Sequence, residues 1–227
     1  MKACIFIFSV VSLSAFFFFG CKKNEGVDFH TDYYPVKKGK YIIYQVQDIV
    51  IDDEVNQYDT TNVFIKAIIG DTFVDNEGRV ANRYERWFGP TASGPWTLID
   101  IWTTIVANNR AELVEENNRT IKLVFAPTEY KTWNANTYNT LEELDSYYTD
   151  IHVPYSIGGH SFDSTLTVLQ QYVEPNLIQY KNKYERYAKG VGMIQKVYVD
   201  ELHQNFDTLQ VEKARKLYMN MVSYGQE

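Results

Sequence analysis

The sequence has very little cysteine. Its 227 residues include only Cys4 and Cys21, both at the start of the chain. The residues after Cys21 therefore cannot form an internal disulfide, and they offer no thiol nucleophile and no cysteine-based metal site. A domain built from these residues must be held together by its core alone.

Basic residues are also in short supply. The chain has 22 Lys and Arg residues against 29 Asp and Glu residues, a formal net charge of −7. Proteins that bind nucleic acids need a basic footprint, so we expect no nucleic-acid partner. The same balance argues against a broad electrostatic attachment to anionic lipid.

Signals for helices and for catalysis are scarce as well. No serine lies in a nucleophile-elbow motif, and Gly190-Val191-Gly192 lacks the third glycine of a dinucleotide-binding loop, so it predicts a hairpin turn. We expect no cofactor and no enzymatic activity. Aromatic residues, in contrast, make up 15% of the chain and include 18 tyrosines, which favours half-buried β-strands.

The N-terminus carries an export pattern. Lys2 precedes the apolar run 3–19, and the run ends at Gly20-Cys21. A positive start, an apolar core and a small residue before the cut are typical of a secretory signal, which we place at residues 1–20. An uncleaved anchor helix is the alternative, but it leaves the Gly20-Cys21 ending unexplained. The polar residues 21–31 predict a flexible tether before a single β-rich domain at 32–227.

Gly20 and Cys21 resemble a bacterial lipobox, the signal of exported lipoproteins, although Phe18 and Phe19 depart from the usual residues. The resemblance implies that the chain is cut before Cys21 and that Cys21 is acylated, which makes the membrane its partner through two or three acyl chains. Because Lys22 rather than Asp follows the cysteine, the resemblance also implies sorting to the outer membrane. The side of that membrane on which the domain lies stays open.

The pattern of the domain predicts an all-β fold, mainly antiparallel, with about ten strands. A sheet this wide tends to curl, so we expect a half-barrel or a barrel. Asn108-Asn109 and Asn117-Asn118 predict tight turns. A capping box at Thr140–Glu143 predicts one short helix to Ser146, and the composition of 210–215 also favours helix.

Residues 178–188 alternate in character. Tyr180 and Tyr184 share one face of a predicted strand, and Lys183 and Glu185 share the opposite face. Apolar faces of antiparallel strands usually face the core. We therefore expect Tyr180 to point inward, with Glu185 on the opposite face of the strand.

Four segments resemble those of uncharacterised short outer-membrane lipoproteins of the Bacteroidota kind, and the resemblance covers most of the chain after Cys21. The segments are 34–41, 133–136, 162–166 and 187–192. They are turn and strand motifs rather than catalytic ones. The resemblance implies an antiparallel β domain and an envelope address, and it implies no activity.

His152, His160 and Asp163 form the nearest approach to a ligand or catalytic cluster. Imidazole and carboxylate groups can bind zinc or transfer protons, but the spacing matches no standard motif, so polar loop residues are the favoured interpretation and we predict no metal. Asp75-Asn76-Glu77-Gly78 predicts a turn rather than a calcium loop.

The tryptophans are Trp87, Trp96, Trp102 and Trp133. With the many tyrosines they could line a cavity or form a stacking platform, although ordinary core packing is favoured. The leading hypothesis is a lipid-anchored envelope protein with a non-enzymatic binding or structural role, whose partner is another envelope protein or an apolar ligand. A carrier or sensor of a lipid or other apolar molecule in a β half-barrel is the alternative, and an enzyme acting on envelope polymers is the weaker one.

Overall fold

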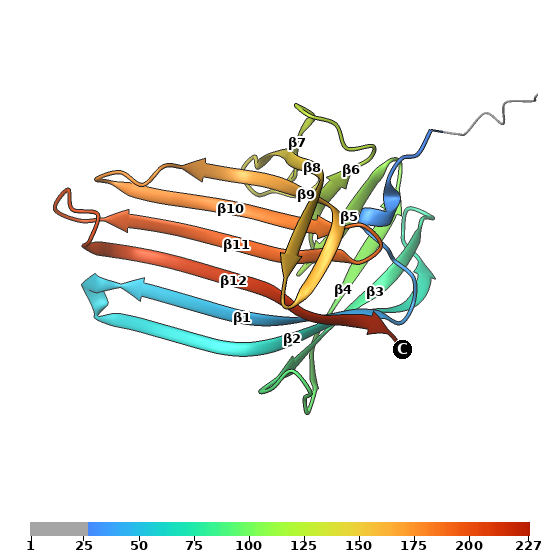
Figure 1. Cartoon of the computed structure of the whole chain (residues 1–227), viewed down its shortest axis with the longest axis horizontal. Helices are drawn as coiled ribbons and strands as arrows, with labels where there is room; N and C mark the ends of the chain where they lie inside the picture. The colour runs from blue at the N-terminus through green and yellow to red at the C-terminus, as the bar shows by residue number, and fades with distance from the viewer. Residues whose placement is uncertain (1–26) are drawn as a thin grey trace, which may run out of the picture.

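The computed structural model describes residues 27–227, which form a single antiparallel β-sheet of twelve strands (Figure 1). This confirms the predicted all-β class and its curled, barrel-like shape. The order across the sheet is β6-β5-β4-β3-β2-β1-β12-β11-β10-β9-β8-β7, so all the paired neighbours but one are strands that follow each other in sequence. The exception is the pairing of β1 with β12, which joins the two ends of the chain in the middle of the sheet.

The strand bounds are β1 Lys40–Asp52, β2 Gln57–Val74, β3 Val80–Gly89, β4 Thr97–Ala107, β5 Arg110–Glu115, β6 Asn118–Val124, β7 Thr132–Asn134, β8 Asp145–Ile157, β9 His160–Val173, β10 Gln179–Ala188, β11 Gly192–His203 and β12 Val211–Gln226. Two short 3₁₀ turns, η1 Thr31–Tyr33 and η2 Asp53–Val55, are the only helical elements among residues 27–227.

The two edges of the sheet, β6 and β7, come together and almost close a barrel. The Ile121 backbone N–H donates to the carbonyl of Ala135 at 2.9 Å, and the Trp133 indole donates to the carbonyl of Ile121 at 3.2 Å. The Tyr148 hydroxyl also bonds both backbone groups of Val124 at 2.8 Å. These contacts leave few backbone N–H and C=O groups of the edge strands β6 and β7 free to pair with another chain.

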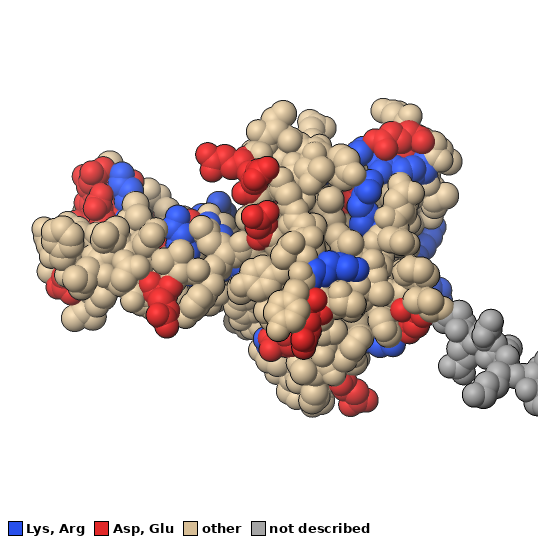
Figure 2. Space-filling model, turned by 90° about the horizontal axis from the view of Figure 1, so that it is seen from above, with Lys and Arg blue, Asp and Glu red and all other residues tan. Residues whose placement is uncertain are grey.

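The long strands continue beyond this barrel as a sheet extension, which we define as residues 47–63, 170–183 and 198–216 (Figures 1 and 2). Strand β3 pairs with β2 only from Phe64 onward, and β8 pairs with β9 only up to Leu169. The hydrophobic core accordingly lies in the barrel, where its buried members are Tyr33, Tyr44, Val46, Ile65, Ala67, Ala111, Leu123, Phe125, Tyr148, Phe162, Leu166, Val168, Tyr187, Ala188, Ile194 and Met221.

The predicted tight turns are present. Asn108 and Asn109 have φ of 51° and 59° and connect β4 to β5, as two-residue hairpin turns require. The second turn uses Glu116 and Asn117, one position earlier than expected, and Asn118 already belongs to β6. Gly190 also has positive φ in the connection from β10 to β11, which confirms that hairpin.

The helix predicted at Thr140–Ser146 is wrong, because asparagine side chains bind the backbone groups that a helix would use. The Asn136 amide donates to the carbonyl of Glu142 at 2.6 Å, and the Asn134 side chain accepts from the Leu144 N–H at 3.1 Å. The segment is an irregular loop held from outside, a known alternative to helical hydrogen bonds. Strand β8 then begins at Asp145.

The helical preference of 210–215 is also overridden. Val211 starts strand β12, and Lys213 and Arg215 pair with Leu202 and Asp200 of β11. Pairing within a wide sheet outweighs the local propensity, which is worth only a few tenths of a kcal/mol per residue.

Candidate functional site: a cavity inside the barrel

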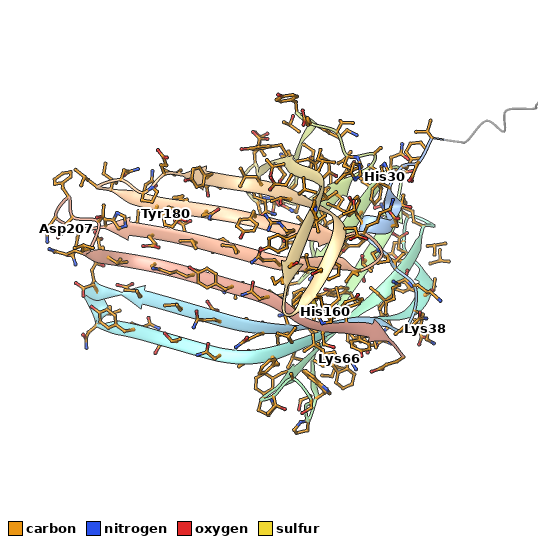
Figure 3. All side chains as sticks on the ribbon, in the orientation of Figure 1. His30, Lys38, Lys66, His160, Tyr180 and Asp207 are labelled. Atoms are coloured by element: carbon orange, nitrogen blue, oxygen red, sulfur yellow. The ribbon has the colours of Figure 1, made fainter. Side chains whose placement is uncertain are left out.

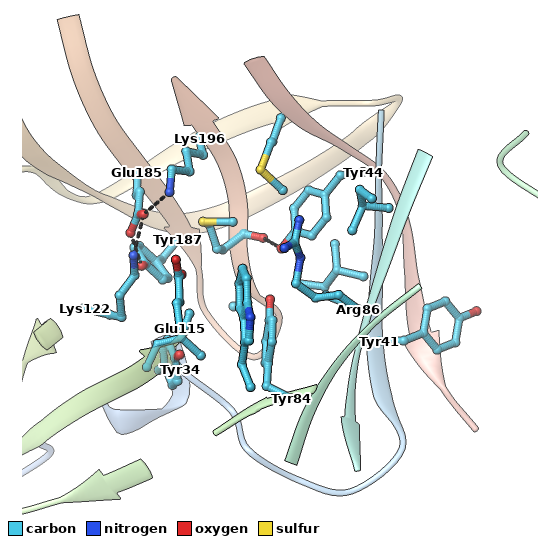
Figure 4. A pocket seen from close by; sticks show the side chains of 18 of the residues that line it. Tyr34, Tyr41, Tyr44, Tyr84, Arg86, Glu115, Lys122, Glu185, Tyr187 and Lys196 are labelled. Atoms are coloured by element: carbon cyan, nitrogen blue, oxygen red, sulfur yellow. Dashed lines mark hydrogen bonds and ion pairs between the residues drawn. The ribbon is translucent and has the colours of Figure 1, made fainter. Parts of the chain in front are cut away.

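The barrel contains a partly open cavity of about 410 Å³ between β1–β6 on one side and β10–β12 on the other (Figure 4). The residues that line it are Tyr34, Pro35, Lys40, Tyr41, Ile42, Tyr44, Ile65, Ala67, Ile69, Tyr84, Arg86, Trp102, Leu113, Glu115, Lys122, Glu185, Tyr187, Val191, Gly192, Met193, Lys196, Tyr198, Arg215, Leu217 and Met219. Most are aromatic or aliphatic, and a few charged side chains interrupt this wall.

Aromatic rings make up much of the wall. Tyr84 and Trp102, paired across β3 and β4, stack with a centroid distance of 6.2 Å and an interplanar angle of 7°. The Tyr44 hydroxyl donates to the carbonyl of Met193 at 2.7 Å, which fixes its ring beside the cavity. Burial raises the pKa of Tyr34, Tyr44 and Tyr84, so these side chains stay neutral.

A buried charge cluster is the main polar feature of the wall. The carboxylate of Glu185 is 1% exposed and accepts hydrogen bonds from the Lys122 ammonium and the Tyr187 hydroxyl, both at 2.6 Å. The Lys196 ammonium approaches the same carboxylate at 3.4 Å. We call Lys122, Glu185 and Lys196 the charged triad (Figure 4).

Glu185 and Lys122 are both ionised at neutral pH. Burial alone would raise the pKa of Glu185, but the positive charges of Lys122 and Lys196 and the hydrogen bonds from Lys122 and Tyr187 outweigh it and hold the pKa at about 2. Burial likewise opposes the charge of Lys122, yet Glu185 and Glu115 together raise the pKa of that ammonium. An ion pair inside an apolar cavity is therefore maintained.

Arg86 adds a further cation on the opposite side of the cavity (Figure 4). Its guanidinium lies 4.1 Å from the centroid of the Trp102 ring and donates to the Asp100 carboxylate at 2.9 Å. The arginine is thus both stacked and neutralised.

The structure does not bring His152, His160 and Asp163 together. The Nδ1 atom of His152 shares a hydrogen bond with the Tyr33 hydroxyl at 2.8 Å. The His152 ring packs edge-on against that of His30, with a centroid distance of 4.6 Å. The ring of His160 packs against that of Tyr224 with a centroid distance of 5.3 Å, in a part of the barrel well away from His30 (Figure 3). Asp163 is exposed. No group of three or more His, Cys, Asp or Glu side chains in the described chain is arranged to hold a metal ion.

The turn at Asp75 is also accounted for by protein contacts. Its carboxylate accepts from the backbone N–H groups of Glu77 and Arg79 at 2.9 and 2.8 Å, and it pairs with the Arg79 guanidinium at 2.8 Å. The favoured interpretation of Asp75-Asn76-Glu77-Gly78 as a turn agrees with these contacts.

Of the four tryptophans, Trp102 lines the cavity. Trp133 packs on Tyr148 in the core, with a distance of 4.8 Å between the ring centroids. Trp87 and Trp96 are not among the lining residues either. The predicted lipid site Cys21 lies outside the described residues, as do the predicted signal peptide and most of the tether.

The sequence-based reasoning missed the charged triad. Tyr180, predicted to point inward, is only partly buried and lies in the extension (Figure 3), while Glu185, on the opposite predicted face, is fully buried. The end of β10 is buried on both faces, since Glu185, Tyr187 and Ala188 are all inaccessible, so alternation could not show which face was internal. The one available signal was Lys122, a lone charge between the apolar residues Ile121 and Leu123.

Comparisons with known proteins add little. No protein-family model matches the chain, and no curated protein matches it at a significant level. Among solved structures, it is similar to a "putative lipoprotein" from Parabacteroides distasonis, with 10% identity over 85% of this chain and 98% of the other and a TM-score of 0.42. At that level the similarity carries no argument about ligand or activity. None of the helical segments in residues 27–227 has the length and apolar character that crossing a membrane requires.

Proposed function

We propose that this protein is a lipid-anchored, non-enzymatic binding protein of the cell envelope, and that it holds an apolar ligand inside its barrel. The observation that carries the proposal is the cavity of about 410 Å³ with an aromatic and aliphatic wall. Small-molecule sites typically measure about 300–1,000 Å³ and combine an apolar wall with a few fixed polar groups. The alternative interpretation, a barrel filled by its own side chains, would leave no such space.

The address rests on the sequence. Lys2, the apolar run 3–19 and Gly20-Cys21 support export and acylation of Cys21, and Lys22 supports the outer membrane as the destination. The described part of the chain begins, in blue, at the barrel end of the molecule, opposite the tip of the extension (Figure 1). A lipid at Cys21 would therefore keep the cavity-bearing barrel nearer to the bilayer than the extension.

The test is native mass spectrometry of the full-length protein extracted from its own envelope in detergent. We expect an additional mass from an apolar molecule that leaves on activation. Ala67 is 6% exposed and lines the cavity, so Ala67→Phe should fill the space and remove the additional mass. Thr60→Phe, at an exposed position of the same strand, is the matched control and should retain it.

Thermal melts of both variants show whether the fold has survived. A folded Ala67→Phe protein that still carries the ligand, or a parent protein that carries none, would contradict the proposal.

A further inference from the structure

The charge of the cavity wall is opposite to the charge of the chain. Basic residues are outnumbered by acidic ones in the sequence, 22 to 29, but the charged lining residues are five cations and two carboxylates: Lys40, Arg86, Lys122, Lys196, Arg215, Glu115 and Glu185. Arg86 is neutralised by Asp100, and Arg215 lies 3.4 Å from Asp48. The lining charges that remain are those of Lys40, the charged triad and Glu115, and in the triad with Glu115 two ammonium groups face two carboxylates.

Within the charged triad the two lysines are not equivalent. The Lys122 side chain is 8% exposed, bonds Glu185 at 2.6 Å, and has its charge further favoured by Glu115. The Lys196 side chain is 26% exposed, and its one ion pair among the described residues is the 3.4 Å approach to the same Glu185 oxygen. Two ammonium groups share one carboxylate, and Lys122 holds the closer contact.

Lys196 is consequently left with unused binding capacity. An ammonium group has three N–H donors, and no hydrogen bond from Lys196 to the described residues accompanies its long ion pair. A cation at the wall of a low-dielectric cavity interacts strongly with any anion that enters it.

We propose that the ligand is an amphipathic monoanion, a carboxylate on an apolar chain, whose headgroup binds Lys196 while its chain lies along Tyr44, Tyr84 and Trp102. This inference rests on the proposed function and adds the chemical class of the ligand. Glu185 makes its closer contact with Lys122, so a single negative charge would give Lys196 the short ion pair that it lacks. Glu115 acts on Lys122, so it disfavours an anion on that side and directs the headgroup to Lys196.

The experiment uses the full-length chain in nanodiscs of zwitterionic phosphatidylcholine, titrated with ω-bromododecanoate and, separately, with ω-bromododecanol. Bromine quenches tryptophan fluorescence on contact, and Trp102 is the tryptophan that lines the cavity. Three variants accompany the parent: Lys196→Met, which keeps the apolar stem and leaves the Lys122–Glu185 pair intact; Lys38→Met, which removes an exposed lysine outside the cavity; and Trp102→Phe.

We expect the acid to quench the parent protein at about tenfold lower concentration than Lys196→Met, because a charge-assisted hydrogen bond is lost, whereas the alcohol should quench both proteins equally. Lys38→Met should behave as the parent, and Trp102→Phe should lose the quenching. Using the same nanodiscs throughout cancels the partition of each probe into lipid.

Two outcomes would overturn the inference in distinguishable ways. If both probes quench Trp102 but Lys196→Met shifts neither, or shifts both alike, the acidic headgroup is wrong and the proposed function stands. If neither probe quenches Trp102 in the parent protein, the cavity takes up no apolar chain, and the proposed function fails together with the inference.

Discussion

A fully buried carboxylate is costly, and Glu185 is 1% exposed. Its cost is offset by two hydrogen-bond donors, Lys122 of β6 and Tyr187 of β10, and by the nearby charge of Lys196 in β11. Buried ion pairs seldom stabilise a fold more than apolar residues of equal volume would, so their presence is weak evidence for stability. The proposed ligand site gives the buried carboxylate a role other than stability.

Removal of the carboxylate should leave two unpaired ammonium groups. We expect Glu185→Gln to lower the free energy of unfolding by about 3 kcal/mol at pH 7 in urea titrations. Because the pKa of Glu185 falls from 4.5 to about 2 on folding, its contribution is complete above pH 4.5 and is lost as the pH falls toward 2. The difference from the parent should therefore shrink at pH 3.

The exposed Glu143→Gln is the matched control and should change stability by less than about 0.5 kcal/mol. A Glu185→Gln protein as stable as this control would show that the carboxylate is not held by the lysines.

The charged triad could not have been predicted from the sequence, because it joins positions 122, 185 and 196 through a barrel whose register is set by the whole sheet. Trp102 was among the residues considered for a cavity wall, but its aromatic character alone did not separate it from Trp133 in the core.

At the level of elements, local turn chemistry was the most informative signal. Asn108-Asn109 was predicted correctly because asparagine tolerates positive φ. The helix at Thr140–Ser146 was predicted wrongly, since a capping box is local, whereas Asn134 and Asn136 bind that segment from outside. Signals within a few residues were reliable where the turn is made by those residues alone.

The hairpin between β8 and β9 gives a prediction of this kind, because its two glycines have different surroundings. Gly158 and Gly159 have φ of 58° and 78°, so alanine at either position should cost about 1–2 kcal/mol of strain. A Cβ at Gly158 would also lie 2.2 Å from the carbonyl oxygen of Met221 in β12, whereas a Cβ at Gly159 meets nothing within 4 Å.

We therefore expect Gly158→Ala to lower the free energy of unfolding by about 2 kcal/mol more than Gly159→Ala does. Its melting temperature should be correspondingly lower. Equal effects in differential scanning calorimetry would mean that this hairpin does not press against β12.

At the scale of the whole molecule, the sheet has two parts with different surfaces. The barrel encloses the core, whereas the end of the extension exposes apolar side chains on three neighbouring hairpins. These side chains, each 54–90% exposed, are Val55, Tyr58, Leu177, Ile178, Phe206 and Leu209. The sequence predicted the curled sheet from its many strands, but the extension follows from strand lengths, with 18 residues in β2 and 16 in β12, which alternation alone did not delimit.

The membrane attachment that we propose for the whole molecule depends on position 21. Cys4 and Cys21 are the only thiols, so each serves as the control for the other. Cells grown with an alkyne-tagged palmitate should label the parent and Cys4→Ala proteins, and Cys21→Ala should stay unlabelled and keep the mass of an unprocessed chain. One acyl chain binds a bilayer only marginally, so the loss of two or three should also move the protein out of the membrane fraction unless the apolar run 3–19 retains it. Label on the Cys21→Ala protein, or none on the parent, would show that the chain is attached in another way.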